Sequence, residues 1–447
     1  MQILRTSVEG IEWPALPGPD AGPLLALLFQ LEQSQWWSPE ELQIMQYRQL
    51  SCLLSHAYKT VPYYREQLVH VGYIPGKEIT PEEFSSLPIL HRSQVQSLCE
   101  ALHSRQVPKS HGTVYNLQTS GSTGKPVKAL GTDLTRLFWS VMTLRDHLWH
   151  KRDFSGKLAA IRTKVPEVVR QGWGLPTDSV FKTGVLATLN IKADLQTQMT
   201  WLQEHNPDYL LSLASNIKGL AELSLETGIK LQNLREVRTF GEVVSPELRR
   251  LCRDAWGVKI ADMYSAEEIG YMALQCPEQE HYHVQSESVL LEVLDENNRA
   301  CGPGEIGRVV ITPLHNFAMP LIRYEILDYA ERGEACSCGR GLPVIRRVMG
   351  RQRHLITFPD GRRHWPSYPP ETWAYVAPIR QYQLIQKALD HIHVKLVMDR
   401  QLTQQEEKQI VPLLQKGLGY PFRITFECLD MIERNQNFKY EDFISEI

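Results

Sequence analysis

The chain has 447 residues, of which 43% are hydrophobic and 22% charged, and its formal net charge is −3. This length allows two or three domains with sizeable cores, and the balance is that of an ordinary globular protein. A charge so close to zero gives no reason to expect nucleic acid or a membrane surface as a partner. No apolar run approaches the roughly 20 residues of a membrane span. Eight cysteines in so long a chain do not form a disulfide framework, so we expect a cytoplasmic protein.

The first part of the chain, up to about residue 105, is predicted to be mostly helical. Ser38 is a favourable N-cap, Pro39 suits the first helical position, and apolar residues then follow at helical spacing. Pro62 blocks continuation of that helix. We expect residues 1–105 to form a helical cap region without chemistry of its own.

Between about residues 209 and 268 short apolar runs alternate with helical patterns. The runs Tyr209–Leu213, Val237–Phe240 and Val258–Met263 are predicted strands, and Ser245 starts a helix between the last two. Such alternation favours an α/β fold with a parallel sheet, and ligands bind beyond the carboxyl ends of its strands. Gly241-Glu242 and the segment from Tyr264 to Glu268 should therefore lie on one edge of the sheet.

The rest of the chain has a different pattern. Residues 284–330 look antiparallel, with strands predicted at 290–294 and 307–312, and residues 358–362 look like a hairpin turn. The last 65 or so residues read as strand, strand, helix and strand, at 383–385, 393–397, 403–418 and 424–426. They predict a small α+β unit separate from the main sheet.

One stretch combines hydroxyl side chains, two glycines and a lysine ahead of a proline. Its residues are Thr119, Ser120, Gly121, Ser122, Thr123, Gly124, Lys125 and Pro126. Glycines let the backbone approach a ligand closely, and exposed N–H groups, hydroxyls and an ammonium make a cradle for phosphate. It is not a Walker A loop, because the glycines lie too close together and Pro126 replaces the magnesium-binding hydroxyl. A flexible turn is the alternative interpretation.

Four later segments extend this pattern. Tyr264-Ser265-Ala266-Glu267-Glu268 is similar to a Tyr-Gly-x-Thr-Glu motif, and the segment from Arg323 to Asp328 to an Arg-Tyr-x-x-Gly-Asp motif. Residues 350–353 resemble a hinge motif, and residues 434–440 an Arg-x-x-x-Gly-Lys-Phe segment. With the phosphate loop, these segments resemble the adenylate-forming superfamily, in its phenylacetate–CoA ligase-like and capsule-biosynthesis-like branch. The resemblance covers essentially the whole chain.

The resemblance implies a fold and an activity. The expected fold is α/β, with a large N-terminal AMP-binding domain (1–352) of parallel and mixed sheets flanked by helices. A small mobile α+β domain (353–447) would carry the catalytic lysine. The expected reaction activates a carboxylic acid with ATP and Mg²⁺ to acyl-AMP and transfers the acyl group to a thiol, coenzyme A.

The resemblance also implies roles for single residues. Lys439, Glu268 and Lys125 are the expected catalytic groups, with Glu268 holding magnesium and Asp328 the ribose hydroxyls. The expected nucleotide-binding residues are Thr119, Ser120, Gly121, Ser122, Thr123, Gly124, Gly241, Glu242, Tyr264, Ser265, Ala266, Asp328 and Arg351. The candidate positions of the acid pocket are Trp139, Ser212, Ala214, Gly241 and Ala266.

A separate set of cysteines and histidines has the composition of a metal site. Three cysteines and one histidine form a closed tetrahedral zinc set, and the alternative is a group of reduced, buried cysteines. Relatives in the resembled branch can hold structural zinc. The resemblance favours Cys276, His283, Cys336 and Cys338 as ligands, with His281 as a substitute for His283.

Two other functions stay open at this point. The chain could load a carrier protein or an amine instead of coenzyme A. It could also be a nucleotide-binding homologue without turnover, because Ser265, Leu327, Arg353 and Phe438 depart from the motifs. The expected substrate is a small acid, with a family preference for aromatic ones, and a dimer is not excluded.

Overall fold

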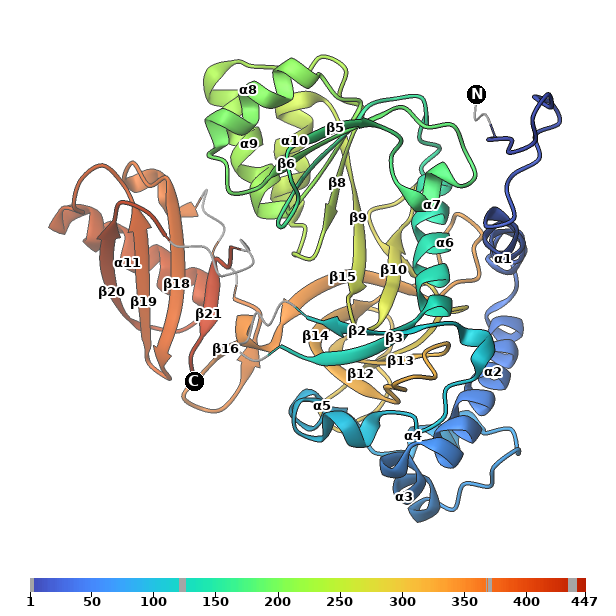
Figure 1. The fold of residues 1–447 in the computed structure, drawn as a ribbon. Coiled ribbons are helices and arrows are strands. Elements are labelled where there is room, and N and C mark those ends of the chain that lie inside the picture. The colour runs from blue at the N-terminus through green and yellow to red at the C-terminus, as the bar shows by residue number, and fades with distance from the viewer. Residues whose placement is uncertain (1–3, 120–125, 367, 369–371, 433–439) are drawn as a thin grey trace. The chain divides into compact units, whose positions relative to one another are not determined.

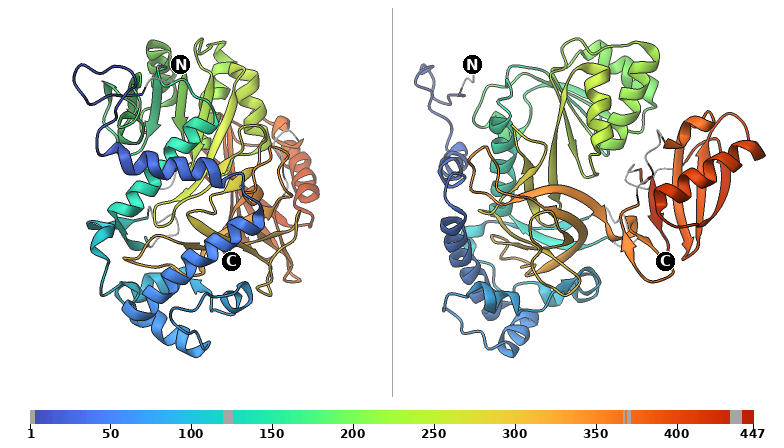
Figure 2. Two further views of the ribbon diagram at one scale, coloured as in Figure 1. Left: turned by 90° about the vertical axis from the view of Figure 1, so that its right-hand side faces the viewer. Right: turned by 180° about the vertical axis from the view of Figure 1, so that it is seen from behind.

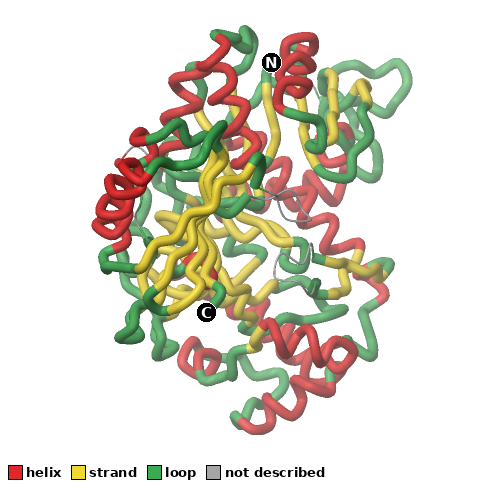
Figure 3. The backbone as a smooth tube through the Cα atoms, turned by 90° about the vertical axis from the view of Figure 1, so that its left-hand side faces the viewer, coloured by secondary structure: helices red, strands yellow, loops and turns green. Residues whose placement is uncertain are grey.

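The computed structural model describes residues 4–119, 126–366, 368, 372–432 and 440–447 (Figure 1). The chain divides into two compact units, residues 1–348 and 349–447. The sequence had suggested a boundary after Gln352 instead. Helices and strands occur together in a mixed α/β protein, as expected (Figure 3). Within the described residues, no helix is both long enough and apolar enough to cross a membrane.

The N-terminal region is helical, as the caps and apolar spacing predict (Figure 2). Ser38 accepts a hydrogen bond from the backbone of Glu41, whose carboxylate binds the Ser38 N–H, so the second helix begins with a capping box. Pro62 ends that helix and opens the next one. The elements are α1 (Ala21–Ser34), α2 (Pro39–Thr60), α3 (Pro62–His70), α4 (Pro81–Ser85), β1 (Leu90–His91) and α5 (Arg92–Leu98).

A hairpin and a long helix follow. The strands β2 (Val114–Gln118) and β3 (Lys128–Thr132) pair antiparallel and hold the expected phosphate loop between them. Thr132 then caps α6 (Asp133–Trp149). Short 3₁₀ turns lie at Cys99–Leu102, Lys109–His111, Gln352–His354 and Ala374–Val376.

The main sheet contains thirteen strands among the described residues, in the order β12-β13-β14-β15-β11-β10-β9-β8-β7-β4-β6-β5, with β1 on β14. Its parallel part confirms the predicted alternation, because β6, β4, β7, β8 and β9 are neighbours in parallel pairs. The elements here are β4 (Leu158–Arg162), β5 (Val168–Gln171), α7 (Leu175–Asp178), β6 (Val185–Asn190), α8 (Leu195–His205), β7 (Tyr209–Ser212), α9 (Ala214–Thr227), β8 (Glu236–Phe240), α10 (Pro246–Trp256) and β9 (Lys259–Ala266).

The strand β9 is longer than the sequence suggested. We expected it to end at Met263, but Tyr264, Ser265 and Ala266 continue it because they pair antiparallel with β10. The antiparallel part of the sheet confirms the prediction for residues 284–330. Its strands are β10 (Gly270–Gln275), β11 (Tyr282–Val284), β12 (Val289–Leu294), β13 (Ile306–Pro313), β14 (Tyr324–Arg332) and β15 (Val344–Arg351).

The C-terminal unit has its own sheet and core. The order β20-β19-β18-β21 forms a four-stranded sheet, and Ile410, Leu414 and Leu418 of α11 lie buried in its core. The helix α11 confirms the prediction for residues 403–418, and Thr403 is its N-cap. The strand β21, which pairs in parallel with β18, was not predicted. The elements are β16 (Ile356–Thr357), β17 (Arg363–His364), β18 (Gln381–Ala388), β19 (His391–Val397), α11 (Gln404–Leu418), β20 (Arg423–Leu429) and β21 (Phe443–Ser445).

One buried arginine ties the N-terminal helices to the sheet. Arg145 of α6 is fully buried, and its Nη2 lies 3.0 Å from Oε1 of Glu287. The same guanidinium donates to the carbonyl of Leu31 in α1 (2.9 Å) and to Oε1 of Gln285 (2.9 Å). Three separate segments therefore meet at one cation.

We expect Arg145→Met to lower the free energy of unfolding by about 3–5 kcal/mol, because Glu287 would be left buried without its counter-charge. A denaturant titration of the variant and the parent measures the difference. Arg48→Ala is the control, because Arg48 pairs with Glu78 in an ion pair whose side chains are 59% and 72% exposed. That change should cost less than about 1 kcal/mol. Equal effects of the two substitutions would contradict the assignment.

Candidate functional site

The expected phosphate loop is closed at its base by Thr119. The backbone N–H of Thr119 donates to the carbonyl of Val127 (2.9 Å), and the Val127 N–H donates to Oγ1 of Thr119 (2.8 Å). These bonds extend the β2–β3 hairpin by one more pair. Ser120, Gly121, Ser122, Thr123, Gly124 and Lys125 lie outside the described residues, so their phosphate contacts stay a prediction.

Glu268 lies in the turn between β9 and β10 and is 5% exposed. Its Oε1 lies 3.1 Å from Nη1 of Arg92, the first residue of α5. The Tyr324 hydroxyl donates to the same oxygen (3.3 Å) and accepts from Arg92 Nη1 (2.8 Å). Burial beside Glu268 raises the pKa of Tyr324, which keeps the hydroxyl protonated as a donor. Glu268 is thus a carboxylate held in a dry, charged cluster.

Arg92 was missed by the sequence reasoning. Its Nη2 reaches Oγ1 of Thr119 (3.4 Å), so one guanidinium touches both the base of the phosphate loop and the expected magnesium carboxylate. An arginine at the start of a short helix carries no sequence signal of such a role. Only the pairing of β1 with β14 brings α5 to this place.

Tyr264 and Asp328 meet across the sheet. The Tyr264 hydroxyl donates to Oδ2 of Asp328 (2.9 Å), so two predicted motifs 64 residues apart are joined. Leu327 has a φ of 69°, in the left-handed region that favours glycine, and it stands where the resembled motif has glycine. The pairing of β13 with β14 shifts register in this segment, between Arg308 and Val310. Leu327 therefore adopts, within a bulge of β14, the backbone conformation that a glycine would favour beside Asp328.

The other expected nucleotide residues lie along the same sheet. Gly241 follows β8 with a φ of 71°, and the carboxylate of Glu242 accepts from the backbone N–H (2.7 Å) and hydroxyl (3.1 Å) of Ser215 at the start of α9. Ser265 and Ala266 pair with β10 at the end of β9. Since β7, β8 and β9 are parallel, their carboxyl ends share one edge, as predicted.

Not every expected position lies open to a ligand. Ser212 is fully buried, and its hydroxyl donates to the carbonyl of Ile161 (2.9 Å), while Ala214 is 3% exposed. Trp139 packs against Tyr271 with ring centroids 4.9 Å apart. Arg351 belongs to the C-terminal unit, where its N–H donates to Nδ1 of His354 (3.2 Å). Lys439 lies outside the described residues.

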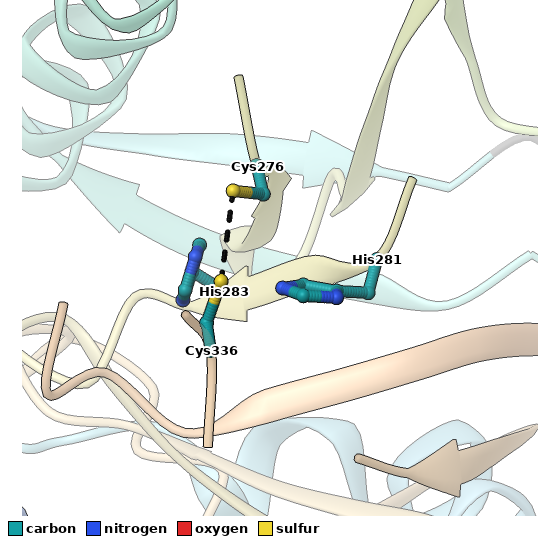
Figure 4. A group of neighbouring side chains, drawn as sticks. All are labelled: Cys276, His281, His283 and Cys336. Carbon is teal, nitrogen blue, oxygen red and sulfur yellow. Dashed lines mark hydrogen bonds between the residues drawn. The ribbon is translucent and has the colours of Figure 1, made fainter. Parts of the chain in front are cut away.

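The cysteines and histidines predicted to bind metal do gather in the structure (Figure 4). The ligand atoms of Cys276, His281, His283 and Cys336 all lie within 4.8 Å of one another. The two thiols are 3.9 Å apart, and Cys338 Sγ lies 3.4 Å from Nε2 of His283. Four candidate ligands thus form one group, and Cys338 adjoins it through His283, although four ligands suffice for zinc.

The electrostatics of this cluster suit a cation. Burial raises the pKa of Cys276, and raises that of Cys336 to about 12, so without a cation these thiols keep their protons. Burial lowers the pKa of His283 to about 4, and Nδ1 of its neutral ring lies 3.4 Å from the carbonyl of Leu342. A proton on Nδ1 leaves Nε2 as the ligand atom, which is the usual arrangement of a metal-binding histidine. The donor set therefore fits zinc.

Comparison with known proteins gives a consistent picture. The family described as the CapK C-terminal domain matches residues 371–446. The chain is 24% identical to the phenylacetate-coenzyme A ligase of Thermus thermophilus over 387 residues, which are 80% of this chain and 81% of that protein. It is 23% identical to the Escherichia coli phenylacetate-coenzyme A ligase over 400 residues, with 82% and 85% covered.

A solved structure of 2-hydroxyisobutyryl-CoA ligase, in the postadenylation state with 2-HIB-AMP, superposes with a TM-score of 0.73. It is 17% identical and covers 93% of this chain and 92% of its own, so it shows the fold. The motifs, the relatives and the fold agree: residues 371–446 match the CapK C-terminal domain, and over about four fifths of its length the chain is similar to phenylacetate-coenzyme A ligases.

Proposed function

We propose that this protein is an AMP-forming acid–thiol ligase, which activates a small or aromatic carboxylic acid with ATP and passes the acyl group to coenzyme A. The observation that carries the proposal is the convergence of distant motif residues on one buried cluster. Thr119, Glu268 and Tyr324 all contact Arg92, and Tyr264 binds Asp328 beside them in the sheet. The kinship with phenylacetate-coenzyme A ligases supports the same reaction.

The chain's own residues suit the two substrates of the first step. Mg²⁺ prefers carboxylate and phosphate oxygens, so Glu268 is the residue we assign to it; the ion would neutralise charge on the phosphates. Lys125 and the loop that starts at Thr119 would hold the phosphates. Asp328 would accept hydrogen bonds from the ribose hydroxyls, with Tyr264 fixing its carboxylate through Oδ2.

The proposed reaction has two balanced steps. A carboxylate oxygen of the acid attacks the α-phosphorus of ATP, and pyrophosphate leaves with the electron pair of the broken P–O bond. The thiolate of coenzyme A then attacks the acyl carbon, and AMP leaves. Both steps depend on positioning and charge neutralisation. We assign Lys439 to the first step, where its ammonium would stabilise charge in the transition state.

The test of the function is a pyrophosphate release assay with a panel of aromatic and small acids, with and without coenzyme A. We expect acid-dependent pyrophosphate release, and AMP plus a thioester when coenzyme A is present. Acyl-AMP formation without a thioester would point to a carrier protein or an amine as the acceptor. If no acid gives pyrophosphate while ATP still binds, the chain is a nucleotide-binding homologue and the proposal is wrong.

A lysine substitution separates the two steps. Lys439→Ala should slow acyl-AMP formation by about 10²-fold or more, because an interaction made in the transition state is lost. Conversion of supplied acyl-AMP to thioester should continue at the parent rate. The control is Lys416→Ala, which removes an exposed lysine from α11 of the same unit. Equal rates of acyl-AMP formation in the Lys439 variant and the parent would remove this lysine from the mechanism.

We further propose that Cys276, His283, Cys336 and Cys338 hold one structural zinc ion. Three thiolates and one imidazole close the tetrahedron, so no position is left for a substrate. The contact of Cys338 Sγ with Nε2 of His283 supports Cys338 as a ligand, and His281, which lies in the same group, is the alternative. In Cys338, hydrogen bonds from Arg340 outweigh burial and lower the thiol pKa, which favours the thiolate that zinc needs.

Elemental analysis of protein purified without an affinity metal should find about one zinc per chain. Cys336→Ser should lose the metal and lower the melting temperature, because structural zinc contributes directly to folding stability. His281→Gln should still bind one zinc ion, whereas Cys338→Ser should have a lower affinity for zinc. Cys52→Ser, at an exposed cysteine outside the cluster, is the control. Zinc-free parent protein, or zinc loss in the His281 variant alone, would contradict this ligand set.

A further inference from the structure

Arg92 is a buried cation that the proposed reaction has not yet used. It is 5% exposed, and its guanidinium contacts the side chains of three residues: Glu268 at 3.1 Å, Tyr324 at 2.8 Å and Thr119 at 3.4 Å. Its Nε is buried and has no hydrogen-bond partner among the described residues. All three partners belong to the segments that resemble the nucleotide-binding motifs.

Arg323 is a buried arginine whose contacts differ from those of Arg92. Arg323, on the neighbouring stretch of chain, pairs with Glu292 through Nε (3.1 Å) and Nη2 (2.9 Å). It also donates to the backbone carbonyls of Ser85 and Leu87, as an arginine that holds segments together does. Arg92 makes its hydrogen bonds with side chains instead. These hydrogen bonds orient the side chains of Glu268, Tyr324 and Thr119.

Arg92 and Tyr324 hold Glu268 through one of its two carboxylate oxygens. Arg92 and Tyr324 both bind Oε1, so among the described residues Oε2 is not engaged by either of them. Two donors that fix one carboxylate oxygen also fix the direction of the other. The same guanidinium reaches Thr119, where the phosphate loop begins.

We propose that Arg92 is a positioning residue of the nucleotide site, which orients Glu268 through Oε1 and ties it to Thr119 at the base of the phosphate loop. Magnesium bound to ATP would then meet a carboxylate whose direction, and whose position relative to Thr119, Arg92 already fixes. This inference rests on the proposed function, because the magnesium role of Glu268 is part of that proposal.

The test measures the magnesium requirement of Arg92→Gln and Arg92→Lys. Arg92→Gln should raise the Mg²⁺ concentration for half-maximal acid-dependent pyrophosphate release by about 10- to 100-fold, which is the usual effect of losing an outer partner of a metal ligand. The maximal rate at saturating Mg²⁺ should fall much less. Arg92→Lys should shift the requirement by only about threefold, because the charge stays while the fork of donors is lost.

Two comparisons separate positioning from stability. In a Glu268→Gln background, Arg92→Gln should cause no further shift, because Arg92 acts through that carboxylate. Arg145→Met, which breaks a buried pair elsewhere in the same unit, should lower the unfolding free energy without changing the magnesium requirement. A parental magnesium requirement in Arg92→Gln, or a full additional shift in the Glu268→Gln background, overturns the inference. If Arg92→Gln does not fold, Arg92→Lys decides by the same measurement.

A calorimetric titration with ATP at several Mg²⁺ concentrations distinguishes failure of this inference from failure of the proposed function. If no acid supports turnover but Arg92→Gln weakens Mg²⁺-dependent ATP binding, the ligase proposal falls and the role of Arg92 stands. If turnover occurs and the ATP binding of Arg92→Gln keeps the parental Mg²⁺ dependence, the role of Arg92 falls alone. Parent protein that binds no ATP at any Mg²⁺ concentration removes both.

Discussion

A charge that leaves water must find a counter-charge, and this constraint shapes the N-terminal unit. Asp146 of α6 accepts bonds from Arg152 (2.6 Å) and Arg238 (2.7 Å), and Arg152 also binds Glu236. Burial raises the pKa of Asp146, but the two guanidinium groups outweigh it, and the carboxyl stays ionised. An unpaired charge at any of these places would destabilise the fold, so each pair fixes how two segments pack.

The same constraint brings Arg92 and Glu268 together at the candidate site. The helix α5 meets β14 through the short strand β1, and its first residue supplies the cation that a buried carboxylate requires. The ion pair with Arg92 offsets part of the cost of burying the Glu268 carboxylate. The carboxylate that we assign to magnesium and the fold of the N-terminal helices are therefore linked. The helical region, which looked devoid of chemistry in the sequence, contributes directly to the candidate site.

Local rules account for what the sequence could predict. The helix caps at Ser38 and Ser245 depend on a few neighbouring residues, so the sequence predicts them, and it also predicts the alternation of the parallel strands. The pair of Arg92 and Glu268 spans 176 positions, and nothing in either segment announces it. The strand β21 was missed because three residues carry too little pattern, and its parallel pairing with β18 decides its state. The family resemblance predicted that these cysteines and histidines gather, whereas their composition and spacing alone left buried, reduced cysteines as an alternative.

Leu327 has a consequence for how the candidate ribose site is prepared. A glycine at this bulge would have more conformations in the unfolded chain than leucine has. Folding therefore costs less backbone entropy with leucine. In return the folded chain carries a left-handed leucine, which costs on the order of 1–2 kcal/mol and persists only when its surroundings hold it. The left-handed conformation is thus harder for this chain to adopt, but once formed the bulge has few other conformations to visit. Asp328 therefore follows a stiff, slightly strained bulge of β14. If a ribose binds there, little backbone entropy remains to be lost.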